Sequence, residues 1–222
     1  RRRIADSFGA VFWQQDEGLF CDAVDDPDGV DSGGGRVPTG RYSEQTNAAA
    51  IVFGLASAEQ SAAIVERLWA GGDRFLAGTN NGVTEANPFF TSVVLKALSA
   101  AGRTDLALEV IRDRWGGRMV DAGSSSTHEE WSIHGSWRRG DELTPIMRTL
   151  SHAWSAFPAR WLIEYLAGIE IVEPGCRTVR VRPVAAAFDY DVIFPTPRGE
   201  IAVSRRDGEI EVRVPDSMTR TD

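Results

Sequence analysis

The residues best suited to chemistry are concentrated in one stretch, Gly123–Trp131. Its nine positions hold four hydroxyl side chains, one histidine, the adjacent carboxylates Glu129 and Glu130, and a tryptophan. The stretch has no apolar periodicity, so we do not expect a core helix or strand there. Hydrogen-bonding groups beside an ionisable pair and an aromatic plate are what a sugar-processing site needs, with one carboxylate acting as general base. The alternative is a solvated loop whose Trp131 fills a neighbouring gap.

Other kinds of site have little support in the sequence. The run Ser124–Ser126 shows no GxSxG pattern of the kind that presents a nucleophilic serine. The histidines His128, His134 and His152 lack the HExxH spacing of a zinc site. The acidic loop at 22–31 lacks the ligand spacing and the closing glutamate of an EF-hand. We therefore expect neither a metal nor a cofactor.

The elements that must position this stretch are predicted to be helical over residues 1–168. Ser57 and Gln60 spell a capping box, and Asn87 before Pro88 suits a helix start. Apolar helices alternate with amphipathic ones, which predicts helical hairpins with inner and outer members. The expected helices cover about 2–13, 48–55 (buried on most sides), 57–69, 87–101, 106–115 (capped by Thr104) and 155–168, with a long loop at 116–150.

In a ring of hairpins the loops that lead into inner helices meet at one rim, where helix N-termini also present free N–H groups. His152 there contacts either substrate or the backbone of its own helix, and Trp131 and Trp154 serve either as a sugar plate or as core packing. Tyr42 and Asn47 are more often helix-entry residues. The rim is expected to gather Tyr42, Gln45, Asn47, Glu85, Asn87, His128, Glu129, Glu130, Trp131, His134, Trp137, His152 and Trp154.

From residue 169 the apolar period changes from helical spacing to alternation. Val179 and Val181 alternate with arginines, as do the apolar residues near 201–203 and 210–214 with polar ones. Turn residues separate these runs, and Arg206-Asp-Gly208 is a hairpin signal. The fold class is thus mainly α with a C-terminal β part: a helical domain at 1–168 and a small antiparallel β-sandwich of four or five strands at 169–222.

Composition limits the partners. The net charge of −8 argues against nucleic acid or an anionic membrane as a partner, and no apolar run approaches the roughly 18 residues of a membrane span. Cys21 and Cys176 lack metal or redox spacing, so free thiols in the cytoplasm are expected rather than secretion. Arg1–Ile4 lead into no signal-peptide core, and the chain starts without Met. We therefore expect a fragment of a longer protein.

Six segments, in order along nearly the whole chain, resemble bacterial α-L-rhamnosidases. The stretch Gly123–Trp131 is similar to their "GATTFWEEW", and Ser151–Pro158 to their "CHAWSAAP". The other four segments are similar to "FWDEEKGLYxD", "YSQHTNAL…FGL", "SPYF" and "PTPHGEIxV". They are Phe12–Asp22, Tyr42–Leu55, Asn87–Phe90 and Pro195–Ile201.

The resemblance implies a ring of six α-hairpins followed by a β-sandwich, and cofactor-free, inverting hydrolysis of terminal α-L-rhamnosides. It implies that Glu129 is the general base, with Glu130 as second choice, and that His152 contacts the sugar. His128 and Thr127 depart from the family's aromatic pair before the base, which puts the exact sugar in doubt. The candidate substrate-binding residues are His152, His128, Trp131, Trp154, Tyr42 and Asn87.

The chain carries only half of the helices that such a ring needs. The family's general acid lies in the earlier half, so we expect that half upstream, and this chain alone to be inactive. Two alternatives stay open. One is another sugar enzyme on a helical ring, such as a trehalase-like hydrolase, a phosphorylase or a lyase; the other is a non-catalytic sugar-binding or scaffold remnant.

Overall fold

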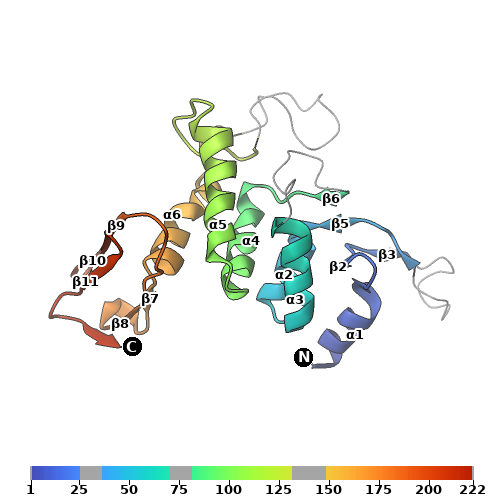
Figure 1. The fold of residues 1–222 in the computed structure, drawn as a ribbon, viewed down its shortest axis with the longest axis horizontal. Coiled ribbons are helices and arrows are strands. Elements are labelled where there is room, and N and C mark those ends of the chain that lie inside the picture. The colour runs from blue at the N-terminus through green and yellow to red at the C-terminus, as the bar shows by residue number, and fades with distance from the viewer. Residues whose placement is uncertain (1, 26–36, 71–81, 132–148, 222) are drawn as a thin grey trace. The chain divides into compact units, whose positions relative to one another are not determined.

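The structure is a computed structural model in which the chain forms two compact units. The units are Arg1–Ser155 and Ala156–Asp222, and Figure 1 shows the elements of each. The described residues are 2–25, 37–70, 82–131 and 149–221. Within them, no helix has both the length and the apolar character that crossing a membrane requires.

The first unit is mainly helical, as the sequence predicts. Two of its helices continue in wider turns, and one short segment forms a 3₁₀ turn. Short paired strands occupy the connections. The helical segments are α1 (Arg2–Phe12), α2 (Glu44–Val52), α3 (Ala58–Val65) with η1 (Glu66–Ala70), α4 (Pro88–Ala100), α5 (Thr104–Val110) with η2 (Ile111–Val120), and η4 (Ala153–Ala156). The strands are β1 (Trp13–Gln14), β2 (Leu19–Phe20), β3 (Val24–Asp25), β4 (Val37–Pro38), β5 (Tyr42–Ser43) and β6 (Val83–Thr84).

Two predicted helix starts are confirmed by side-chain caps. Ser57 and Gln60 form a reciprocal capping box at α3. The Asn87 side chain accepts a hydrogen bond from the Phe90 amide at the start of α4. Each cap satisfies amides that the first helical turn leaves without a partner.

The start and end of α5 differ from the prediction. Arg103, not Thr104, is the N-cap, because Gly102 at φ 73° reverses the chain at the end of α4 and leaves no further linker residue. The helix then continues as η2 through Gly116 and Gly117 to Val120, so the predicted loop begins later than residue 116. Buried Met119 anchors this last part, and tertiary packing outweighs the low helix propensity of glycine.

Helix α4 is the centre of the first unit, because it packs against both α2 and α5. Helix α2 is less uniformly buried than its apolar sequence predicts. Its fully buried positions include the polar residues Glu44 and Asn47, whereas Phe53 at its C-terminal end is 67% exposed. The polar side chains at the start of α2 are therefore buried, whereas the aromatic residue just after its end is exposed.

The second unit combines one helix with two three-stranded sheets. The sheet orders are β11-β10-β9 and β12-β8-β7, and η5 packs against β7 and β9. The elements are α6 (Phe157–Trp161) with η5 (Leu162–Leu166), β7 (Ile169–Ile171), η6 (Pro174–Cys176), β8 (Thr178–Val181), β9 (Tyr190–Thr196), β10 (Gly199–Arg206), β11 (Glu209–Arg213) and β12 (Thr219–Thr221).

The strand predictions are confirmed in part. Asp207 and Gly208 connect β10 to β11 as a two-residue hairpin, both at positive φ (50° and 88°). Strand β12, however, pairs with β8 in parallel, so the second sheet is mixed rather than antiparallel. The intervening strands β9 to β11 supply the long crossover that a parallel pair needs.

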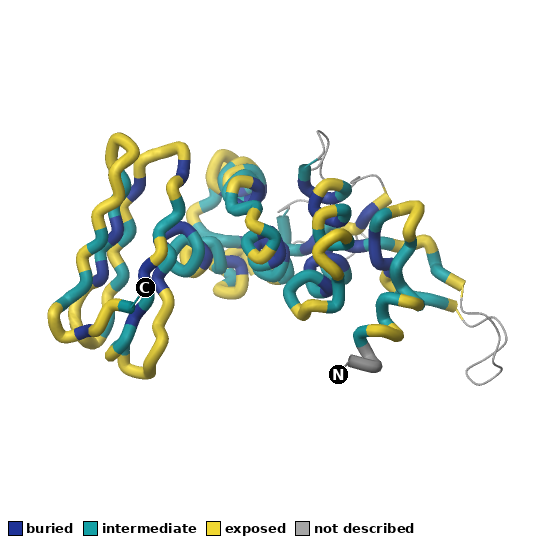
Figure 2. Tube along the Cα trace, turned by 60° about the horizontal axis from the view of Figure 1, so that its bottom comes forward, coloured by how far each residue is buried: buried dark blue, intermediate teal, exposed yellow. Residues whose placement is uncertain are grey.

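Burial in the second unit follows the predicted alternation in the central strands (Figure 2). Val179 and Val181 of β8, and Ile201 and Val203 of β10, are buried. Ile210 on the edge strand β11 is 38% exposed, because a strand at the edge of a sheet has a neighbour on one side only. The first strand of this unit, β7, begins at Ile169, where the apolar period changes. A domain boundary at residue 169 stays a prediction. In the structure, α6 and η5 belong to the same compact unit as the strands.

Candidate functional site

The loop that carries Glu129 is hydrogen-bonded to the segment that carries His152. The His152 amide donates to the Thr127 carbonyl at 2.8 Å, and the Thr127 hydroxyl donates to the His152 carbonyl at 3.1 Å. The Glu129 amide donates to the Thr149 carbonyl at 2.9 Å, and the Thr149 amide donates to Glu129 Oε2 at 3.0 Å. The structure thus brings these two predicted site residues onto neighbouring, mutually bonded segments.

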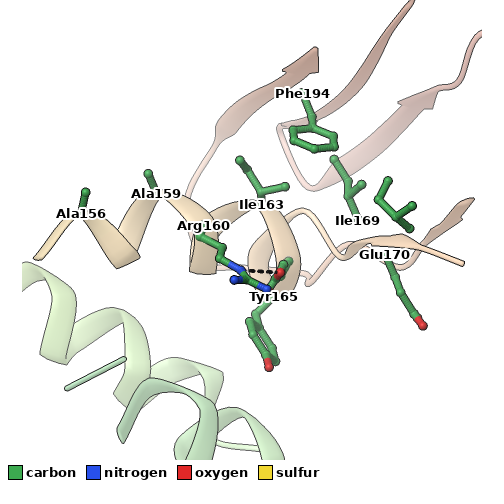
Figure 3. Close-up of a pocket in the computed structure, with 10 residues that line it drawn as sticks. Ala156, Ala159, Arg160, Ile163, Tyr165, Ile169, Glu170 and Phe194 are labelled. Atoms are coloured by element: carbon green, nitrogen blue, oxygen red, sulfur yellow. Dashed lines mark hydrogen bonds and ion pairs between the residues drawn. The ribbon is translucent and has the colours of Figure 1, made fainter. Parts of the chain in front are cut away.

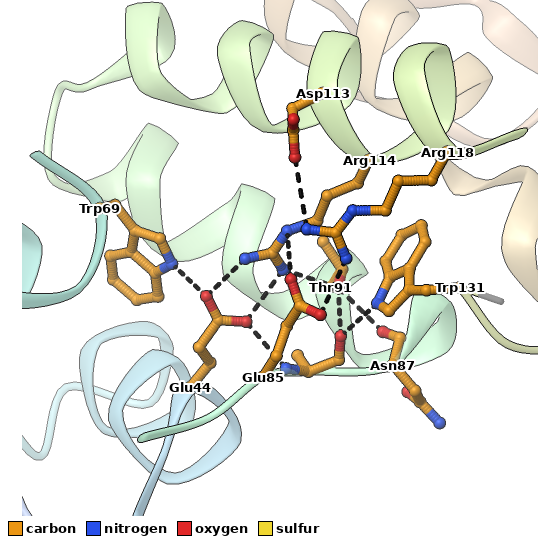
Figure 4. A network of polar contacts seen from close by, with 10 residues as sticks. Glu44, Trp69, Glu85, Asn87, Thr91, Asp113, Arg114, Arg118 and Trp131 are labelled. Carbon is orange, nitrogen blue, oxygen red and sulfur yellow. Dashed lines mark hydrogen bonds and ion pairs between the residues drawn. The ribbon is translucent and has the colours of Figure 1, made fainter. Parts of the chain in front are cut away.

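Trp131 fastens the same loop to the start of α4. Its indole N–H donates to the Ala86 carbonyl at 2.7 Å, and its ring meets Trp115 edge to face at a centroid separation of 4.8 Å. The guanidinium of Arg118 lies 5.6 Å from the ring centroid (Figure 4). These contacts anchor the loop; a role for Trp131 as a sugar plate remains a prediction.

A buried ion pair lies next to the contacts of Trp131. Arg114 donates to both carboxylate oxygens of Glu44, at 2.6 and 2.9 Å, and both side chains are fully buried. The Trp69 indole and the Ala86 amide each donate to the same carboxylate at 2.8 Å (Figure 4). Glu44 therefore joins η1, η2 and the segment before α4 at one point.

The surroundings of Glu44 favour the charged form of its carboxyl. Burial by itself raises the pKa of its carboxyl, but the charge and hydrogen bonds of Arg114, with those of Ala86 and Trp69, outweigh burial and hold the pKa below its ordinary value. For Arg114, burial lowers the pKa, but Glu44 and then Glu85 and Asp113 outweigh it and raise the pKa further. Both partners are charged at neutral pH.

Glu85, one of the predicted rim residues, extends this ion pair toward the surface. Its carboxylate lies 3.3 Å from Arg114 Nε and 2.9 Å from Arg118 Nη1. Arg118 also lies 3.4 Å from Asp113. Glu85 thus forms ion pairs with two arginines, and its side chain is only 14% exposed.

Sequence reasoning missed both arginines of this network, together with Glu44, Trp69 and Asp113. Arg114 and Arg118 are like charges four residues apart, which share one face of a helix and destabilise it unless acidic groups oppose them. The spacing of the two arginines therefore indicates that acidic side chains lie opposite this face of the helix. Nothing in the local sequence points to Glu44, which is 70 residues from Arg114, or to Trp69.

Three rim residues lie at helix or strand starts. Tyr42 pairs with Val83 in the parallel β5–β6 ladder and is half-buried. Burial, then the charges of Glu17 and Cys21, raise the pKa of its phenol. Asn87 caps α4, as described above. The buried Asn47 side chain bonds backbone groups of Phe20 and Ser43, which is a structural role.

The two described histidines have different surroundings. His128 is 6% exposed, and its Nδ1 has no hydrogen-bond partner among the residues that the structure describes. Its carbonyl accepts from the buried Ser155 hydroxyl. The His152 ring stacks on Trp154 with centroids 4.1 Å apart and planes at 21°, and Trp154 in turn contacts Phe89 at 5.2 Å.

Other candidates occupy less informative places. Glu130 and Gln45 are half-buried, while His134 and Trp137 lie outside the described residues. Asp22 accepts from the Ser43 and Thr46 hydroxyls, both at 2.6 Å, and so supports the start of α2. Among the described residues, no group of three or more His, Cys, Asp or Glu could hold a metal ion.

The second unit contains a cavity of about 930 Å³ along α6 and η5 (Figure 3). Apolar side chains such as Ala159, Ile163 and Phe194 line it, and the Arg160–Glu164 pair, at 2.7 Å, lies along it. None of the predicted site residues contributes to its lining. The cavity and the Glu129 loop therefore share no residue.

Comparison with solved structures finds α-L-rhamnosidases. The GH78 family rhamnosidase of Bacillus sp. GL1 matches with a TM-score of 0.71 and 24% identity, over 98% of this chain and 23% of that chain. The Aspergillus terreus α-L-rhamnosidase matches with a TM-score of 0.67 and 18% identity, over 99% and 24% of the two chains. The Streptomyces avermitilis α-L-rhamnosidase complexed with L-rhamnose matches with a TM-score of 0.65 and 21% identity, over 99% and 20%.

No family model and no curated protein matches the sequence. The solved structures agree with one another over almost all of this chain, which spans only about a fifth to a quarter of their length. The chain therefore has the fold of one portion of the α-L-rhamnosidases.

Proposed function

We propose that the chain is the C-terminal part of a glycoside hydrolase that removes terminal α-L-rhamnose from glycosides or polysaccharides. The observation that carries this proposal is the fold match over 98% of the chain to a rhamnosidase of which it spans 23%. The remaining part, with the general acid, lies upstream in this proposal. The free thiols of Cys21 and Cys176 favour a reducing compartment, so we place the protein in the cytoplasm.

The proposed architecture is about half of an (α/α) six-hairpin barrel followed by a β-sandwich. In such a ring, each inner helix packs against the next inner helix and against its own outer partner. The packing of α4 against α2 and α5 agrees with this order. The two three-stranded sheets of the second unit supply the two layers of the proposed sandwich.

In the proposed mechanism Glu129 is the general base. Its Oε2 accepts a hydrogen bond from the Thr149 amide, which orients the carboxylate while leaving it the capacity to accept a proton from water. An inverting glycosidase places the acid and the base about 6.5–9.5 Å apart, so that a water fits beneath the sugar. In this proposal the acid belongs to the upstream half of the ring, as the resemblance to the family implies, and Glu130 is the second choice for the base.

His152 supplies a hydrogen-bond donor to the sugar in this proposal. The Trp154 amide donates to His152 Nδ1 at 3.4 Å, and a ring that accepts this bond at Nδ1 carries its N–H group at Nε2. The Nε2–H group can then donate to a sugar hydroxyl. Supporting contacts are proposed for His128, Trp131, Trp154, Tyr42 and Asn87.

Substitution of the two carboxylates in the full natural polypeptide tests the proposal. Glu129→Gln keeps the shape of the side chain but removes the base, so kcat on an aryl α-L-rhamnoside should fall about 10²–10⁴-fold while the sugar still binds. Glu130→Gln is the matched control and should retain most of kcat. A panel of aryl glycosides of other sugars, assayed with the unsubstituted protein, identifies the sugar. An unchanged kcat in both variants would show that the base lies elsewhere.

A further inference from the structure

Three aromatic rings from two separate elements form a row on the first unit. Phe89 belongs to the first turn of α4, whereas Trp154 and His152 belong to η4 and the segment before it. The Phe89 and Trp154 centroids are 5.2 Å apart with planes at 38°, and those of Trp154 and His152 are 4.1 Å apart with planes at 21°. We call these three residues the aromatic row.

The outer part of the row is open to solvent. Phe89 is 48% exposed and Trp154 is 36% exposed, whereas Trp69 and Trp115 of the same unit are buried. Aromatic side chains each carry about 150–250 Å² of surface, and they stabilise a protein most when that surface is covered. These two neighbouring rings therefore form a partly exposed aromatic surface that a ligand can cover.

The row is continuous with the segments that hold Glu129. At its inner end, the His152 backbone exchanges hydrogen bonds with Thr127, two residues before Glu129. At its outer end, Phe89 follows the segment whose Ala86 carbonyl accepts from Trp131. Both elements that build the row are thus tied to the Glu129 loop by direct hydrogen bonds.

The chemistry of the row changes along its length. The inner residue, His152, offers a polar N–H group, which suits a sugar hydroxyl. The outer residues, Phe89 and Trp154, offer aromatic faces and edges, which suit a flat apolar group. From this gradient we infer that Phe89 and Trp154 form a subsite for the aromatic aglycone of the glycoside, next to the sugar-binding end at His152. This inference rests on the proposed function.

The test compares binding of paired glycosides to the full natural polypeptide in which Glu129→Gln stops turnover. Isothermal titration with 4-nitrophenyl and methyl α-L-rhamnopyranoside gives the ratio of the two dissociation constants. Phe89→Ala should weaken binding of the nitrophenyl glycoside about three- to tenfold and that of the methyl glycoside less than twofold. Trp154→Ala, at a residue that is also proposed to contact the sugar, should weaken binding of both glycosides, and that of the nitrophenyl glycoside more. Phe89→Tyr and Trp154→Phe keep a ring and should preserve the ratio.

Phe53→Ala is the matched control, because Phe53 is an exposed aromatic residue at the far end of α2. It should change neither dissociation constant. Equal weakening for both glycosides in Phe89→Ala, or an unchanged ratio, would overturn the inference. A melting temperature lowered by several degrees in Phe89→Ala, with an unchanged ratio, would show that protein rather than aglycone covers the row.

The same titrations with nitrophenyl and methyl glycosides of other sugars separate this inference from the proposed function. If rhamnosides do not bind, but Phe89→Ala selectively weakens another nitrophenyl glycoside, the proposed function fails and the subsite stands. If rhamnosides are hydrolysed and the ratio does not depend on Phe89, the subsite fails and the proposed function stands. If no glycoside binds, both are wrong.

Discussion

At the scale of single residues, the most consequential feature is the buried pair Glu44–Arg114. A buried charge is tolerated only where a partner and hydrogen bonds replace water, and Glu44 accepts from Arg114, Trp69 and Ala86. Because Ala86 also accepts from Trp131, the pair supports the loop that carries Glu129. Its proposed role is positioning, since neither side chain is exposed to substrate.

Glu44→Gln should therefore destabilise the protein strongly. Removing the charge of Glu44 leaves buried Arg114 with Glu85 as its remaining close counter-ion and disrupts the buried pair, which costs about 3–5 kcal/mol. Chemical denaturation measures the change in unfolding free energy. Asp105→Asn is the control: it breaks the exposed pair with Arg103, which should cost less than about 1 kcal/mol. Similar costs for both variants would contradict a special role for the buried pair.

The same variant should change the acid dependence of stability. The pKa of Glu44 is lower in the folded protein than its ordinary value of about 4.3, so the unfolded chain binds more protons between these two values. The stabilisation by Glu44 is complete above the ordinary value and is lost as the pH falls through the folded pKa. Unfolding free energy should thus fall less steeply below about pH 4.3 in Glu44→Gln than in the unsubstituted protein.

At the scale of elements, helix starts place the candidate site. Asn87 caps α4. Ala86, just before it, accepts a hydrogen bond from Trp131, and Phe89, two residues after it, contacts Trp154. A disturbed cap would therefore displace both contacts together. The structure shows the capping role of Asn87, whereas its role in sugar binding is a proposal.

Substitutions at Asn87 separate these two roles. Asn87→Ala should lower stability by about 1 kcal/mol through loss of the cap, whereas Asn87→Ser should retain the cap and lose only the amide. Ser57→Ala, at the capping box of α3, is the control and should cost a similar amount without affecting sugar binding. Thermal melting and titration with L-rhamnose measure both effects. Full binding by Asn87→Ser would exclude a contact from the amide.

At the scale of the whole molecule, the proposed activity depends on the length of chain present. It spans 20–24% of the solved rhamnosidases that it matches, and the proposed function assigns the general acid to the part upstream. The 222-residue chain alone should therefore show negligible hydrolysis of an aryl α-L-rhamnoside, with circular dichroism as the check that helices are present. Turnover by the isolated chain at a rate near that of the full polypeptide would contradict the proposed division of acid and base.

Local rules explain which parts of the fold were predictable. The caps at Ser57 and Asn87 and the hairpin at Asp207-Gly208 depend on residues within three positions of one another, so the sequence predicts them directly. The extension of η2 across Gly116 and Gly117 was not predictable, because buried packing at Met119 overrides local propensity. The exposure of Phe53 was not predictable either, because exposure also depends on tertiary packing rather than on local sequence.

The sequence by itself determined the order of the main helices and the change to strands after residue 168. It also determined the residue types of the Glu129 loop and the resemblance that the solved structures support at the level of fold. Only the tertiary structure decided which distant groups meet. The Glu44–Arg114 pair spans 70 positions, and the Phe89–Trp154 contact joins two elements that are far apart in sequence. Such pairings depend on how helices pack in space, and helical periodicity specifies which face is buried but not which partner that face will meet.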